Sequence, residues 1–146
     1  SYSFLDTKRQ FLNYPALVQP SFAARHTASL VVKRFFSGLK TNVGLAYTIA
    51  SGRPYANPNR SDSDFMTDRT PAFHNLGLNV AHLMSIRKTQ SVLVLTVSNV
   101  LGNQQIFGYT YSVTNPARRE AITPNQNPFI FLGLFVNIGV DRRQDI

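Results

Sequence analysis

The stretch "NVGLAYTIASGRPYANPN", residues 42–59, decides the expected fold because its first half alternates between two kinds of side chain. Every second residue from Val43 to Ile49 is large and apolar, and the residues between them are Gly, Ala or Thr. A period of two is typical of a β-strand whose two faces meet different surroundings. The stretch then enters a segment rich in Arg, Pro and Asn, so we expect the strand to end near residue 50.

The same alternation recurs along the chain. It is found in "HTASLVVKRFF" (26–36), "HNLGLNVAHLMSI" (74–86) and "PFIFLGLFVNIGV" (128–140), where the apolar set continues to Ile138 and Val140. "SVLVLTVSNVLGNQQIFGYTYS" (91–112) has two apolar parts separated by "SNVLGNQ", which predicts a bulge or bend rather than a full turn. With the opening "SYSFLDTKRQFL" (1–12), about six strands are expected.

The connections between these strands alternate between long and short. Residues 13–25, 53–72 and 113–127 form long polar connections, whereas "SGLK" (37–40) and "RKTQ" (87–90) are tight. Strands of about ten residues, short turns at one end and long loops at the other are typical of a transmembrane β-barrel. We therefore expect an all-β fold: an antiparallel meander of about six long strands, forming an incomplete part of a barrel wall with the apolar face toward lipid.

The charge of the chain favours an anionic partner. The 146 residues carry a formal net charge of +8 and no cysteine, so disulfides and thiolate chemistry are excluded. Basic residues lie both in the long connections and near the tight turns or the tail, the second group being Lys33, Lys40, Arg87, Lys88, Arg142 and Arg143. Because they form no single stripe, we expect no nucleic-acid partner.

Four stretches carry a resemblance to the C-terminal part of the barrel of TonB-dependent outer-membrane receptors. They are "PSFAARHTASLVVKRFF", "YTIASGRPYANP", "LTVSNVLGNQQIFGYTYS" and "PFIFLGLFVNIGV". The resemblance covers nearly the whole chain, residues 1–146, as one segment. It implies a place in the outer membrane of a Gram-negative bacterium and a barrel of 22 strands closed by an N-terminal plug.

That resemblance also implies a function and a set of partners. The expected function is uptake of a scarce ligand, such as a siderophore, cobalamin or a glycan, after capture by the outer loops. The expected partners are membrane lipid and lipopolysaccharide, the remaining barrel and the plug, the TonB complex acting through that plug, and the imported ligand. No plug or coupling segment can be placed in the sequence, so a fragment is expected. Phe131 or Phe135 is a candidate for the terminal aromatic that barrel assembly recognises.

Candidate ligand-binding residues lie in the long connections. They are Arg53, Tyr55, Arg60, Arg69, Arg118 and Arg119. Guanidinium groups suit an acidic ligand or lipopolysaccharide. The alternative for "SGRPY" is a loop-opening turn in which Gly52 supplies unusual dihedral angles and Pro54 rigidity. The alternative for the remaining arginines is ordinary solvated charge.

No enzyme, cofactor or metal site is expected. The sequence contains no nucleophile elbow, phosphate loop or dinucleotide fingerprint. His26, His74 and His82 lack metal-ligand spacing, and Asp62, Asp64 and Asp68 lack the glycine and terminal glutamate of a calcium loop. The other functional classes left open are a soluble all-β module that binds a carbohydrate or protein and, with less support, a basic nucleic-acid-binding barrel.

A few residues fit the expected lipid-facing side less well. Arg34 is tolerable because it lies near a tight turn. His82 lies farther from the turn, so it must be neutral or paired, or the strand register slips there. Phe107, Tyr109 and Tyr111 are either core aromatics or part of an interfacial girdle.

Overall fold

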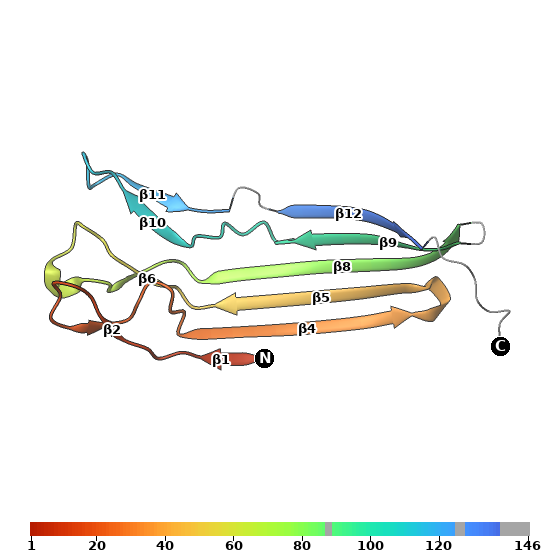
Figure 1. Cartoon of the computed structure of the whole chain (residues 1–146), viewed down its shortest axis with the longest axis horizontal. Coiled ribbons are helices and arrows are strands. Elements are labelled where there is room, and N and C mark those ends of the chain that lie inside the picture. Colours follow the sequence, from red (N-terminus) through yellow and green to blue (C-terminus); the bar gives the residue numbers. More distant parts are fainter. Residues whose placement is uncertain (87–88, 125–127, 138–146) are drawn as a thin grey trace.

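A computed structural model describes residues 1–86, 89–124 and 128–137 of the chain. Six strands form one antiparallel sheet in the order β1, β4, β5, β8, β9 and β12, as seen in Figure 1. Their bounds are Tyr2–Phe4 (β1), His26–Phe36 (β4), Thr41–Ala50 (β5), Phe73–Ile86 (β8), Thr89–Ser98 (β9) and Phe129–Val136 (β12). The expected all-β meander of about six strands is confirmed.

Three small hairpins occupy the long connections. They are β2 (Arg9–Gln10) with β3 (Leu17–Val18), β6 (Pro54–Tyr55) with β7 (Asp68–Arg69), and β10 (Gly108–Tyr111) with β11 (Arg119–Ile122). All three lie at the same end of the sheet in Figure 1, which we call the loop end. The opposite end, the turn end, carries the short 3₁₀ turn η1 (Ser37–Leu39), whereas a second one, η2 (Asp62–Asp64), lies between β6 and β7.

The strand register sorts the side chains onto two faces. Leu45 is paired with Val32 of β4 and Leu78 of β8, and directly opposed residues of antiparallel strands lie on the same face. The face so defined, the apolar face, carries Leu30, Val32, Val43, Leu45, Tyr47, Ile49, Leu76, Leu78, Val80, Leu93, Leu95, Val97, Ile130, Leu132, Leu134 and Val136. The expected Ile138 and Val140 lie outside the described residues.

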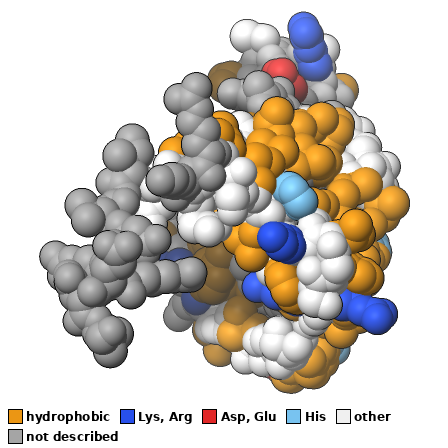
Figure 2. Space-filling model, turned by 90° about the vertical axis from the view of Figure 1, so that its right-hand side faces the viewer, with side chains coloured by type: hydrophobic (Ala, Val, Ile, Leu, Met, Phe, Trp, Pro, Cys, Tyr) orange, Lys and Arg blue, Asp and Glu red, His pale blue; other side chains and the backbone are white. Residues whose placement is uncertain are grey.

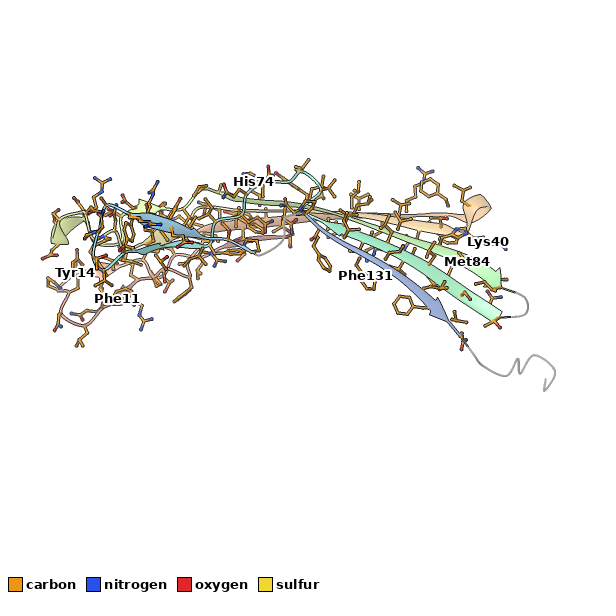
Figure 3. The ribbon with its side chains drawn as sticks, turned by 90° about the horizontal axis from the view of Figure 1, so that it is seen from above. Phe11, Tyr14, Lys40, His74, Met84 and Phe131 are labelled. Atoms are coloured by element: carbon orange, nitrogen blue, oxygen red, sulfur yellow. The ribbon has the colours of Figure 1, made fainter. Side chains whose placement is uncertain are left out.

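The other side of the sheet, the small-residue face, is small and polar near its centre. On β4 and β12 it also carries exposed large apolar residues, including Val31, Phe35, Phe131 and Phe135. Near its centre it carries Ser29, Gly44, Ala46, Thr48, Asn75, Gly77, Asn79, Ala81 and Thr96. A hollow of about 370 Å³, with Gly44 and Gly77 in its lining, opens there. Figure 3 shows His74 of the apolar face and Phe131 of the small-residue face on opposite sides of the ribbon.

The sheet is a single layer. Leu45 and Leu134 are 45% and 53% exposed, and Leu78 is half-buried. In residues 1–86, 89–124 and 128–137, few apolar residues are buried: Ala23, Ala50, Tyr55 and Met66, together with Pro20 and Pro54. Figure 2, a view onto the turn end, shows hydrophobic side chains over much of the visible surface. No described segment therefore covers the apolar face.

The structure corrects the limits of two predicted strands. The opening strand is limited to Tyr2–Phe4, and Arg9–Gln10 of the same stretch pairs with β3 instead. β9 ends at Ser98, and "SNVLGNQ" contains a β-turn in which the Gly102 amide donates to the carbonyl oxygen of Asn99 at 2.9 Å. The chain nevertheless continues toward the loop end (Figure 1), as predicted for a bend. After this turn, β10 pairs with β11 and not with the main sheet.

The polar residues on the apolar face have local partners. All three histidines lie on this face, so the register does not slip at His82. The Nδ1 atoms of His26, His74 and His82 lie 2.7, 2.9 and 2.8 Å from the hydroxyl oxygens of Tyr2, Tyr47 and Thr41, respectively. The Arg34 guanidinium lies 5.0 Å from the centre of the Phe36 ring. The described part of the chain has no helix with the length and apolar character needed to cross a bilayer.

Candidate functional site

The "SGRPY" segment is built around a close contact between two backbone segments. A Cβ atom added to Gly52 would lie 1.9 Å from the carbonyl oxygen of Thr70. The Thr70 amide donates to the carbonyl oxygen of Arg53 at 2.9 Å, and the Arg53 amide donates to the Thr70 hydroxyl at 3.0 Å. Gly52 is not among the residues with positive φ. The prediction of unusual dihedral angles is therefore wrong, and glycine is needed here for space.

This contact positions Tyr55 beside residues from the third long connection. Pro54 is fully buried and Tyr55 is 9% exposed. The Tyr55 and Tyr109 rings are 4.8 Å apart between centroids, inclined at 53°. The Arg119 guanidinium lies 4.6 Å from the centre of the Tyr109 ring and donates from Nη1 to the Tyr55 hydroxyl at 3.3 Å. We call Tyr55, Tyr109, Tyr111 and Arg119 the Tyr–Arg cluster.

Tyr111 belongs to this cluster through its hydroxyl group. That oxygen is buried and has no hydrogen-bond partner at ordinary distance. It is nevertheless near enough to Tyr55 to contribute to a raised pKa of that phenol, whose main cause is burial. It also contributes to the raised pKa of Arg119. Tyr55 is therefore a protonated phenol at neutral pH and has a hydrogen to donate.

A second contact fixes the two hairpins relative to each other. The Asn59 side-chain amide donates to the carbonyl oxygen of Pro116 at 2.8 Å. Together with the contact between Tyr55 and Tyr109, this bond joins the second long connection to the third. The Tyr–Arg cluster is thus held by two parts of the chain that are far apart in sequence.

Arg60 lies in the same connection but is already paired. Its Nη2 atom lies 3.1 Å from Asp68 Oδ1, and the Asn57 side-chain amide donates to Asp68 Oδ2 at 2.6 Å. The bonds from Asn57 and Arg60 hold the pKa of the Asp68 carboxyl below its usual value. Arg60 therefore serves to order the loop between β6 and β7.

The remaining candidates lie apart from the cluster. Arg69 donates to Gln19 Oε1 at 2.6 Å and to the Gly52 carbonyl oxygen at 3.1 Å, so it joins the second connection to the first. Arg53 lines a separate cavity of about 190 Å³, which Phe107 also lines. Arg118 is exposed, and its described bonds are made by its backbone. Of the six candidates, the structure brings only Tyr55 and Arg119 into direct contact.

Sequence reasoning missed the roles of Tyr109, Tyr111 and Asp68. The aromatics were expected in a core or a girdle, but β10 lies outside the main sheet. Phe107 instead stacks with Phe73 of the small-residue face at 6.2 Å between centroids. The signal was the two-residue spacing of the tyrosines, which indicates a common face but not which surface that face meets.

Comparisons with known proteins leave the site to be interpreted from its geometry. No family model, no curated protein and no solved structure matches the chain. In the parts of the chain that the structure describes, no group of three or more His, Cys, Asp or Glu side chains is arranged to hold a metal ion.

Proposed function

We propose that the chain is part of the barrel wall of a TonB-dependent receptor in the outer membrane of a Gram-negative bacterium. The observation that carries this proposal is the uncovered apolar face. It spans five strands of the sheet, from Leu30 of β4 to Val136 of β12, with large side chains left exposed. Soluble proteins rarely expose a continuous apolar surface of this extent. Hydrocarbon is the surrounding that makes such a face favourable.

The small-residue face supports the same proposal from the other side of the sheet. An exposed face of a soluble sheet normally carries long polar side chains, whereas Gly44, Ala46 and Gly77 form the middle of this face. Small residues leave room for material that packs inside a barrel. The hollow of about 370 Å³ at this place fits that role.

Strand length and sheet edges also agree with a barrel wall. The strands β4, β5, β8 and β9 contain 11, 10, 14 and 10 residues, and a tilted membrane strand needs about 9–11. In the described sheet, β12 has a neighbour on one side only. The short strand β1 pairs with Ala28, Thr27 and His26 of β4, and backbone bonds from Ser29 to Ser1 and from Leu5 to Arg25 flank this pairing, so most of β4 is also left without a described neighbour on that side. Edges this long are normally paired or covered, as they are in a closed barrel.

Charge substitutions at two adjacent residues test the proposal. Leu45 belongs to the apolar face and Ala46 to the small-residue face. In the complete protein that contains this chain, Leu45→Arg is expected to lower the stability of the protein inserted in phosphatidylcholine vesicles by about 2–4 kcal/mol. Ala46→Arg is the matched control, because it places the same charge away from lipid, and it is expected to change stability by less.

The outcome separates the receptor from the soluble alternative. Stability is measured by urea unfolding in the vesicles, and folding by the heat-dependent mobility of barrels in gels. Equal effects of the two substitutions would contradict a lipid-facing apolar face. A complete protein that remains monomeric in buffer without detergent would instead favour a soluble binding module, whose apolar face is covered by another part of the protein.

A further inference from the structure

We propose that the Tyr–Arg cluster binds an anionic group, a carboxylate or a phosphate, with Arg119 as the residue that contacts it. The inference deepens the proposed function and rests on it, because the outer loops of an importer are where its ligand first binds. It assigns a ligand chemistry to the loop end and identifies one of six candidate residues as the determinant of specificity.

Arg119 is held in place by its aromatic neighbours. Its guanidinium lies on the Tyr109 ring at 4.6 Å and donates to the Tyr55 hydroxyl at 3.3 Å. Tyr109 in turn is packed on the buried Tyr55 ring. A guanidinium held in this way has little conformational freedom left to lose when it binds a ligand. Its planar fork matches the oxygens of a carboxylate or phosphate.

The loop end carries more basic side chains than ion pairs. The ion pairs among the described residues are Arg25 with Asp6 and Arg60 with Asp68. Arg119 is in neither, as is also true of Arg53, Arg69 and Arg118. It is an exposed cation beside a largely aromatic surface, and its charge is near enough to Asp68 to contribute to the lowered pKa of that carboxyl. Arg60 lies in the second long connection and differs from Arg119, because its charge is paired with Asp68 of the same protein.

The buried hydroxyl of Tyr111 adds a further polar group to the cluster. This hydroxyl is buried and forms no hydrogen bond of ordinary geometry, although it lies close enough to Arg119 and Tyr55 to contribute to the raised pKa of both side chains. Tyr55 and Tyr111 can each donate one hydrogen bond to an acceptor held by Arg119. Two phenols and a guanidinium make a donor-rich site, which a negatively charged oxygen group satisfies better than a neutral sugar hydroxyl does.

The experiment measures anion binding by the complete protein in detergent, using isothermal titration calorimetry. The probes are sodium phosphate and sodium citrate for soluble anions. For the phosphate of a lipid headgroup, the complete protein is held in detergent-free phosphatidylcholine nanodiscs, and its co-flotation is compared for phosphatidylcholine vesicles with and without lipopolysaccharide. Arg119→Gln is compared with Arg118→Gln, which removes the same charge from the neighbouring position outside the cluster.

Arg119→Gln is expected to weaken binding of at least one probe by about tenfold or more, the loss of one charge-assisted contact. Arg118→Gln is expected to change the affinity by less than about twofold, because solvent screens its charge. Arg119→Lys keeps the charge but loses the planar fork, so an intermediate loss is expected. Tyr55→Phe should weaken binding several-fold without changing the net charge.

Two results would overturn the proposal: no binding of any probe, or equal losses in Arg118→Gln and Arg119→Gln. Binding of citrate or phosphate identifies a soluble ligand, whereas a response of lipopolysaccharide vesicles alone identifies a lipid headgroup, and both support the anion site. Membrane insertion is measured separately by gel mobility. A failure of the barrel proposal is therefore distinguishable from a failure of the anion site.

Discussion

The side chains of Thr41 and His82 meet across β5 and β8, with 2.8 Å between Oγ1 of Thr41 and Nδ1 of His82. The two residues are directly opposed in the register and lie on the apolar face. The Thr41 hydroxyl donates its one hydrogen to the carbonyl oxygen of Leu39, so toward His82 it acts as the acceptor. Nδ1 of His82 is therefore the donor in this contact. A polar ring on an apolar face is thus satisfied within the sheet.

Removing the hydroxyl at position 41 should therefore destabilise the sheet. Thr41→Val leaves Nδ1 of His82 without its partner, and an unsatisfied polar group on an apolar face costs about 1–3 kcal/mol. The double variant Thr41→Val/His82→Leu removes both partners and should recover most of that loss. The measurement is a double-mutant cycle, with the free energy of unfolding obtained by urea titration in lipid vesicles.

A control for this cycle lies on the small-residue face. Ser29 and Thr48 share a hydrogen bond of 3.0 Å between their hydroxyl oxygens. If that face meets water or polar protein groups, Thr48→Val should cost less than Thr41→Val, because other partners can satisfy Ser29. Equal losses at positions 41 and 48 would mean that the two faces do not differ in polarity.

The alternation of side chains was enough to predict the main sheet. Val43, Leu45, Tyr47 and Ile49 lie on one face as expected, because a strand places successive side chains on opposite faces. The alternation could not predict which residue forms a hydrogen bond with His82. Thr41 is 41 residues away in sequence, and only the register of β5 against β8 brings the two side chains together.

The loop end was predicted less completely than the sheet. Tyr55 and Arg119 were candidates, but their meeting depends on the packing of two hairpins that no periodicity describes. Gly52 was correctly singled out but for the wrong reason. A single sequence does not distinguish a glycine needed for its dihedral angles from one needed for space, because both place glycine in a loop.

Gly52→Ala should disrupt the second long connection. The added Cβ would lie 1.9 Å from the carbonyl oxygen of Thr70, so the backbone must move, and we expect a loss of about 3 kcal/mol or more in unfolding free energy. Gly133→Ala is the matched control, because its Cβ would meet the outer atoms of the Phe131 and Phe135 rings, which are side chains that can rotate away, and no backbone atom. Limited proteolysis within residues 53–69 provides the readout of loop order. Similar cleavage of wild type and Gly52→Ala would contradict the close contact.

Asn99 offers a test of the turn that ends β9. It has a φ of 50°, is 3% exposed, and its side chain both donates to the Asn103 carbonyl oxygen and accepts from the Asn103 amide. Asn99→Ala loses these bonds, and alanine tolerates the left-handed region less well than asparagine, so about 2–3 kcal/mol of stability should be lost. Asn99→Gly loses the same bonds but adopts the left-handed conformation without strain, so its loss should be smaller. Urea unfolding distinguishes them, and an alanine variant as stable as the glycine variant would exclude backbone strain as a cause.

The loop between β6 and β7 should lose order in acid because of Asp68. Bonds from Asn57 and Arg60 lower the pKa of this carboxyl on folding. A carboxyl with a lowered pKa stabilises the folded loop above its ordinary value of about 3.9, and this contribution is lost as the pH falls through the lowered value. Hydrogen exchange of residues 54–69, corrected for intrinsic rates, should therefore show less protection at about pH 3 than at about pH 6.

Variants of this carboxyl and its partner show whether Asp68 is responsible. Asp68→Asn should give low protection at both pH values, because it cannot accept the charge-assisted bond from Arg60. Arg60→Gln removes one of the groups that lower the pKa, so loss of protection should begin at a higher pH than in the wild type. Protection in the wild type that is as high at the acidic pH as at the higher one would show that the Asp68 carboxylate does not order the loop.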